Sequence, residues 1–194
     1  MLNRDEKLAR IASDDNESYV NRKKALDAIE DKYLISQLAE TVHDEWIRLE
    51  SAVLSNNREV LKTLINHQDE AIQLESAIEL NNQKYLAHIV LHSKDLLHRD
   101  IALNYITKKD ILRELVTRCI FEKDKVEAAL RLRDHDVIKK IIPEIENEEL
   151  KLRLAETIND LKVIAEISRK ANDSRIRQLA GEWVSGFKPE SDID

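Results

Sequence analysis

Hydrophobic and polar positions recur along this chain in a short pattern that appears six times. The pattern is a polar residue, two variable residues, two apolar residues, two polar residues and one or two apolar residues. Its copies begin 26, 25, 26, 26 and 26 residues apart, at Asp31, Asn57, Asn82, Lys108, Asp134 and Asp160. Apolar residues at i, i+1 and i+4 form a stripe on one helix face, so each copy predicts a short helix that starts at its polar residue. A weaker seventh copy begins at Arg4.

A second short helix is expected in each copy, about ten residues after the first one begins. The segments IRLESAVLSNN and IQLESAIELNN, at 47–57 and 72–82, are two of these second helices and are nearly identical. Each second helix carries a small residue, which lets two helix backbones approach closely. We call these residues the marker alanines, and they are Ala25, Ala52, Ala77, Ala102, Ala129, Ala155 and Ala180.

A helical hairpin of this size cannot bury its apolar stripe alone, so neighbouring hairpins must stack. The repeat therefore predicts an all-α fold, a right-handed α-α superhelix (solenoid) of about seven short hairpins of about 26 residues. One domain is expected over 1–185, with a polar, disordered tail at 186–194. One position of the first helices should be interior throughout, and its residues are Leu38, Leu64, Ile89, Leu115, Ile141 and Ile167.

Composition supports a helical fold, since the 194 residues include only two glycines and two prolines. Pro143 lies within a first helix and should end it early. Cys119 is the single cysteine, which excludes an internal disulfide and fits a reducing compartment. No apolar run is long enough to span a membrane, and the start, MLNRDEKLARI, is too polar for a signal peptide. A cytoplasmic protein without membrane association is therefore expected.

The motif at the start of the second helices resembles that of short HEAT-type repeats, a helical-repeat family related to armadillo repeats. It reads DEWIR from Asp44 and DSRIR from Asp173, with weaker copies DEAIQ from Asp69 and DLLHR from Asp95. The resemblance implies a solenoid whose second helices line a concave face, with Asp and Arg of neighbouring repeats paired along the stack. It names no substrate, because a fold of this kind hosts many functions.

The position two before each marker alanine is acidic in four consecutive repeats. A two-residue step turns about 200° around a helix, so these side chains should point to solvent. An acidic column of this kind on a concave face would attract a basic segment of another protein. The alternative is a solvated face whose charges pair locally. The four residues are Glu50, Glu75, Asp100 and Glu127.

Other reactive side chains give weaker signals. His88 and His92 share one helix face, and His67 holds the position of His92 one repeat earlier, which allows a metal site or plain surface histidines. Cys119 has no base placed near it and is expected to be a buried structural thiol. Trp183 should cover the edge of the last repeat, and Trp46 either contacts a partner or packs locally. The sequence assigns no catalytic residue, no cofactor and no metal.

Charge distribution separates the two halves of the chain. The net charge is −7, which argues against a dedicated nucleic-acid binder, yet residues 1–97 carry −6 and residues 98–194 only −1. Basic residues on later first helices leave nucleic-acid binding as the alternative, and they are Arg113, Arg118, Lys139, Lys140, Arg169 and Lys170. The sequence thus favours a non-catalytic scaffold or adaptor that binds another protein, with a structural subunit of a larger complex as a further alternative. It leaves the oligomeric state open.

Overall fold

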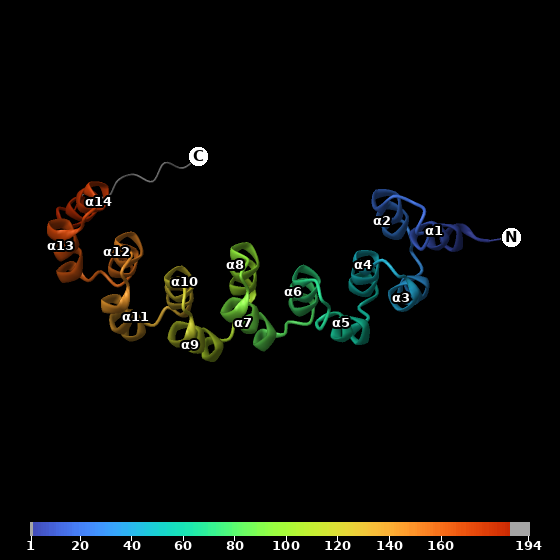
Figure 1. Cartoon of the computed structure of the whole chain (residues 1–194), viewed down its shortest axis with the longest axis horizontal. Helices are drawn as coiled ribbons and strands as arrows, with labels where there is room; N and C mark the ends of the chain where they lie inside the picture. Colours follow the sequence, from blue (N-terminus) through green and yellow to red (C-terminus); the bar gives the residue numbers. More distant parts are fainter. Residues whose placement is uncertain (1, 187–194) are drawn as a thin grey trace. The chain divides into compact units, whose positions relative to one another are not determined.

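The computed structural model describes residues 2–186, and these residues form helices and connecting turns with no strand among them (Figure 1). The all-α prediction is therefore confirmed. The tail predicted at 186–194 lies, apart from its first residue, outside the described residues. The helices are α1 (Arg4–Ala12), α2 (Tyr19–Asp27), α3 (Lys32–Thr41), α4 (Glu45–Ser55), α5 (Arg58–Leu64), α6 (Glu70–Glu79), α7 (Gln83–His92), α8 (Leu96–Tyr105), α9 (Lys109–Arg118), α10 (Glu122–Leu132), α11 (His135–Ile141), the 3-10 helix η1 (Ile142–Glu144), α12 (Glu148–Thr157), α13 (Leu161–Lys170) and α14 (Ser174–Val184).

Two compact units divide the chain. Unit 1 holds α1 to α6, most of α7, and α8. In this unit α1 packs on α2, α3 on α4 and α5 on α6, so consecutive helices form hairpins. The second helices also contact one another, α2 with α4, α4 with α6, and α6 with α8. Figure 1 shows these even-numbered helices of unit 1 in one row and the odd-numbered helices in another.

Unit 2 holds α9 to α14 together with the last turn of α7. It is built in the same way, since α9 packs on α10, α13 on α14, and the second helices contact in the order α10, α12, α14. Pro143 lies in η1, directly after α11 ends. Because proline has no amide hydrogen to continue the helix, the early end predicted for this helix is confirmed.

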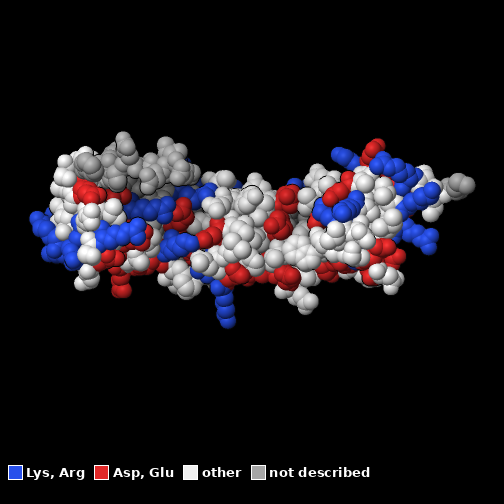
Figure 2. Space-filling view, turned by 90° about the horizontal axis from the view of Figure 1, so that it is seen from above, with Lys and Arg blue, Asp and Glu red and all other residues white. Residues whose placement is uncertain are grey.

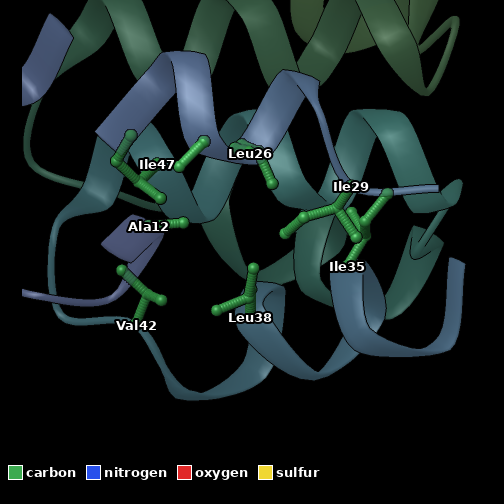
Figure 3. Close-up of a cluster of buried hydrophobic side chains, with 8 residues drawn as sticks. Ala12, Leu26, Ile29, Ile35, Leu38, Val42 and Ile47 are labelled. Carbon is green, nitrogen blue, oxygen red and sulfur yellow. The ribbon is translucent and has the colours of Figure 1, made fainter. Parts of the chain in front are cut away.

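Two sets of apolar residues that recur at the same position of each repeat, here called the two apolar columns, form the core of both units. The predicted interior position is at most 6 % exposed at Leu38, Leu64, Ile89, Leu115, Ile141 and Ile167. The seven marker alanines are at most 5 % exposed. In unit 1, Ala12, Leu26, Ile29, Ile35, Leu38, Val42 and Ile47 form one cluster to which the first two hairpins both contribute (Figure 3). Burying such side chains is the main favourable term in folding, so neighbouring hairpins depend on each other for stability.

The helix starts are fixed by polar side chains, as the sequence predicted. The carboxylate or amide oxygen of the first residue in five copies accepts a first-turn backbone N–H, at Asp31, Asn57, Asn82, Asp134 and Asp160. The fourth copy differs, because neither Lys108 before α9 nor Phe121 before α10 provides a side-chain capping bond.

The turn between hairpins explains the constant spacing. Three asparagines and one arginine at this turn have a left-handed backbone with φ of 50–55°, at Asn56, Asn81, Arg133 and Asn159. The carbonyl of the marker alanine then accepts the amide of the next hairpin's first residue, as in Asn57 N to Ala52 O and Asn82 N to Ala77 O, both 2.8 Å. This is the closing bond of a Schellman turn, and it also joins Asp160 N to Ala155 O, so the turns after α4, α6 and α12 lie at the same distance from their alanines.

Candidate functional site

The four acidic residues singled out in the sequence lie on four second helices. Glu50 is on α4, Glu75 on α6 and Asp100 on α8, all in unit 1, whereas Glu127 is on α10 in unit 2. The prediction that all four point to solvent is wrong in part, because only Glu75 is exposed and the other three are half-buried. The side chains of adjacent second helices flank this column, which a helix taken alone could not reveal.

A hollow of about 330 Å³ in unit 1 brings two of these acids together. Its lining comes from α2, α4 and α6. Leu49 lies at the buried end, and the more accessible part includes Trp46, 38 % exposed, and Leu54, 43 % exposed. The complete lining is Lys23, Trp46, Leu49, Glu50, Val53, Leu54, Glu75 and Glu79. The hollow thus combines an apolar surface with three carboxylates and one ammonium group.

One wall of this hollow is neutralised by contacts within unit 1. The Lys23 ammonium bonds Asp27 at 2.6 Å and forms an ion pair with Glu50. The Tyr19 hydroxyl donates a hydrogen bond of 2.7 Å to Glu50. Burial and this bond to a carboxylate raise the pKa of Tyr19 to about 12. Although partial burial opposes it, the pKa of Lys23 is raised by its bonds to Asp27 and Glu50.

The opposite wall carries two carboxylates from α6. Glu75 and Glu79 are four residues apart and so lie on one helix face, and both are exposed. Desolvation by neighbouring atoms and the negative charge of Glu79 raise the pKa of Glu75. Within residues 2–186, no basic side chain forms an ion pair with either carboxylate. Figure 2 shows acidic side chains at the surface over this part of unit 1, next to uncharged surface.

Unit 2 has a corresponding hollow of about 460 Å³ between α12 and α14. It is lined by Glu149, Leu152, Arg153, Glu156, Ile176, Leu179 and Trp183. Arg153 forms an ion pair of 3.1 Å with Glu127, the fourth acidic residue of the column. Desolvation raises the pKa of Glu156. Trp183 is half-buried and lines this hollow near the end of the last helix, whereas Trp46 lines the hollow of unit 1 at the start of α4.

The histidines considered as metal ligands have separate surroundings. The His67 ring accepts the amide of Asp69 through Nδ1 at 3.0 Å, and its Nε2 lies 3.7 Å from Glu45. His88 is exposed and stacks at a tilt on Tyr85, with ring centroids 5.7 Å apart. His92 is exposed at the end of α7. Residues 2–186 contain no group of three or more His, Cys, Asp or Glu suited to hold a metal ion. Cys119 is buried, as expected.

The basic residues considered for nucleic-acid binding lie on α9, α11 and α13, the first helices of unit 2, and are exposed. Three of the six pair with acids nearby. Arg113 lies 3.5 Å from Asp134, Lys170 lies 2.9 Å from Glu166, and Arg118 pairs with Glu114. Half of this basic charge is therefore compensated within the unit.

The residues of the motif that resembles HEAT-type repeats make contacts both between hairpins and within them. Arg22 of the first hairpin pairs with Asp44 of the next hairpin at 3.1 Å. In five hairpins, the side chain at the arginine position donates to a carbonyl in the last turn of the first helix or in the loop that follows it. The donor–acceptor pairs are Arg22–Ala12, Arg48–Ala39, Gln73–His67, Arg99–Ser93 and Arg177–Ala171. In these five hairpins the motif therefore ties the second helix to the end of the first helix or to the loop between the two.

A set of glutamates that sequence reasoning missed joins one hairpin to the next. Each is the first residue of a second helix and reaches the turn or second-helix start of the following hairpin. Glu70 accepts from Ser93 Oγ at 2.5 Å and contacts His98 Nδ1 at 2.6 Å. Glu148 accepts the amides of Asn172 and Asp173, at 2.7 and 3.2 Å. The signal was a glutamate at the start of a second helix, directly after a capping residue at Glu45, Glu70 and Glu148 and after Phe121 at Glu122.

None of the helices among the described residues is both long and apolar enough to cross a bilayer. Comparison of the chain with protein-family models, with curated proteins and with solved structures gives no match.

Proposed function

We propose that this chain is a non-catalytic scaffold or adaptor that binds another protein through its second helices. In this proposal the two units belong to one right-handed α-α superhelix of seven short HEAT-like hairpins, and the second helices line its concave face. The acidic column of Glu50, Glu75, Asp100 and Glu127 contributes to the binding surface.

The repeated construction of both units supports the architecture. Each unit buries the same two columns, and each joins hairpin to hairpin through contacts between second helices. Stacks built from such nearest-neighbour contacts present an extended row of helices, and repeat proteins use that row to bind partners.

The hollow lined by Trp46 and Glu75 is the observation that carries the binding function. An aromatic side chain that is 38 % exposed beside aliphatic and charged groups has the composition of a protein-binding surface. Its carboxylates on α6 have no cationic partner among residues 2–186 and would attract a positively charged partner.

Charge reversal of the acidic column tests the proposal. The variant E50K/E75K/D100K/E127K is compared with the wild type as bait in native lysate, with circular dichroism to verify equal helicity. Partners are identified by mass spectrometry, and their affinity for both baits is then measured with purified material. We expect binding to fall at least about tenfold, because complementary charge is replaced by repulsion.

A matched control reverses four exposed acids on first helices, as E59K/D110K/D136K/E166K. This control changes the net charge by the same amount and should retain the partner. Equal affinity of a purified partner for the wild type and for the column variant, with helicity retained, would exclude the second-helix surface as the binding site.

A further inference from the structure

We propose that the hollow between α2, α4 and α6 binds a short peptide segment of a partner protein in which a bulky apolar side chain is flanked by Lys or Arg. This inference rests on the proposed function and specifies its chemistry. The apolar residues of the hollow would receive the anchor side chain, and the α6 carboxylates would receive the flanking cation.

The apolar residues determine the first part of this specificity. Leu49 is 3 % exposed, while Trp46 and Leu54 keep large accessible areas. A hollow of about 330 Å³ is at the lower end of the range for binding pockets and suits one or two side chains rather than a whole folded surface. An aliphatic or aromatic anchor would remove the exposed parts of Trp46 and Leu54 from water, which is the usual source of energy in such contacts.

Charge determines the second part. Lys23 is occupied by Asp27 and Glu50, so the only ammonium group in the lining already has two carboxylates. Glu75 and Glu79 stand on the opposite wall as neighbouring like charges. The lining, with three Glu and one Lys, carries a net charge of −2. A Lys or Arg beside the anchor would relieve the repulsion between Glu75 and Glu79, whereas an acidic flank would add to it.

The unit 2 hollow provides an internal comparison. It has a tryptophan and aliphatic residues as well, but Arg153 in its lining contributes a positive charge and pairs with Glu127. With two Glu and one Arg its lining carries −1, so it should select a basic flank less strongly.

Binding of three fluorescein-labelled peptides of about ten residues tests the inference. The first alternates Leu and Phe with Lys and Arg, the second replaces the basic residues by Glu, and the third replaces the apolar residues by Ser. Anisotropy gives affinity, and unlabelled peptides are used to follow tryptophan emission in a W183F variant, where Trp46 is the remaining tryptophan. We expect only the first peptide to bind at micromolar concentration and to shift Trp46 emission.

Two substitutions and a matched control locate the site. E75K/E79K should weaken the first peptide at least about tenfold, with circular dichroism unchanged, because attraction is replaced by repulsion. The control E149K/E156K alters two acids in the unit 2 hollow and should leave this affinity within about twofold. Raising the salt concentration should weaken binding to the wild type but not to E75K/E79K.

Three results would overturn the inference: absence of binding by the first peptide, equal binding of the acidic peptide, or full affinity in E75K/E79K. Concentration-dependent dimerisation abolished by the same pair of substitutions would instead assign the hollow to a second copy of this chain and would also overturn it. The proposed function is tested separately, since a natural partner lost on reversal of the acidic column would still support a scaffold whose contacts lie elsewhere on the second helices.

Discussion

The glutamates that begin the second helices perform the same task in both units with different chemistry. In unit 1, Glu45 and Glu70 approach histidine side chains of the following hairpin. In unit 2, Glu122 and Glu148 accept pairs of backbone amides at the following turn. The packing of hairpins within a unit places each carboxylate near the following hairpin. The local sequence there determines whether the carboxylate contacts a histidine side chain or backbone amides.

A second difference concerns the turns. The turns between hairpins that contain a left-handed residue have Asn56 and Asn81 in unit 1, and Arg133 and Asn159 in unit 2. The hairpin of α9 and α10 also lacks side-chain capping bonds at both helix starts. Its Leu115 and Ala129 are nevertheless fully buried. The buried columns are therefore common to both units, and caps and turn residues adjust stability around them.

The largest effect is expected from a charge placed in the shared column. Leu115→Asp in unit 2 and Leu64→Asp in unit 1 should each reduce the free energy of unfolding by several kcal/mol, because an unpaired carboxylate would enter an apolar contact. Urea unfolding followed by circular dichroism measures the change.

An exposed residue on the same helix is the control for this pair. Thr117→Asp adds the same charge to α9 at the surface and should cost less than about 1 kcal/mol. A loss in L115D no larger than that in T117D would show that this column does not stabilise unit 2.

An intermediate effect is expected at the left-handed turn residues. Arg133→Asn should stabilise the protein by about 0.5–1 kcal/mol, because asparagine adopts positive φ at lower cost than arginine. Asn81→Arg, the reverse change in unit 1, should destabilise it by a similar amount. Thermal unfolding of both variants measures the difference.

Arg133→Lys separates backbone conformation from charge in this comparison. Lysine retains the positive charge and, like arginine, lacks the short polar side chain with which asparagine tolerates positive φ, so the melting temperature of R133K should equal that of the wild type. If R133K stabilised the protein as much as R133N, the conformational explanation would be refuted.

The smallest effect concerns acid stability and the glutamates of unit 2. Bonds from the Glu146 and Asn147 amides lower the pKa of Glu122, and bonds from the Asn172 and Asp173 amides lower that of Glu148. A carboxyl whose pKa is lower in the folded state stabilises that state above its ordinary value of 4.5, and this stabilisation is lost as the pH falls through the folded pKa. The double variant E122Q/E148Q should therefore melt below the wild type at pH 7, and the gap should narrow towards pH 3.

Melting curves of both proteins between pH 7 and pH 3 provide the measurement. The variant Asp110→Asn, which changes an exposed acid on α9, serves as the control. Any difference between its melting temperature and that of the wild type does not involve the bonds of Glu122 and Glu148. A gap between the wild type and E122Q/E148Q that stays constant over the whole range would contradict the proposed role of the two carboxylates.

Much of the local structure was predictable from the sequence. Column positions such as Leu38 and Ala52 are buried, capping residues such as Asp31 begin helices, and Pro143 ends one. These properties depend on residues within one or two turns of the position concerned, so a periodic sequence reveals them directly.

The surface was less predictable. The acidic column was visible as a pattern, but the ion pairs of Glu50 with Lys23 and of Glu127 with Arg153 were not. The apolar residues that share the hollow with Glu75 were also unexpected. These partners lie about 25 residues away on adjacent helices, and their approach depends on how two hairpins pack.

The sequence by itself determined that this chain is helical, where most of its helices begin, and which two columns are buried, because those features follow from hydrophobic period and local hydrogen bonding. Only the tertiary structure decided which acids form ion pairs within the protein and which remain available to a partner. Whether a surface carboxylate is neutralised depends on the side chains of neighbouring helices. The candidate binding chemistry of Glu75, Glu79 and Trp46 therefore became visible only when α2, α4 and α6 were seen packed together.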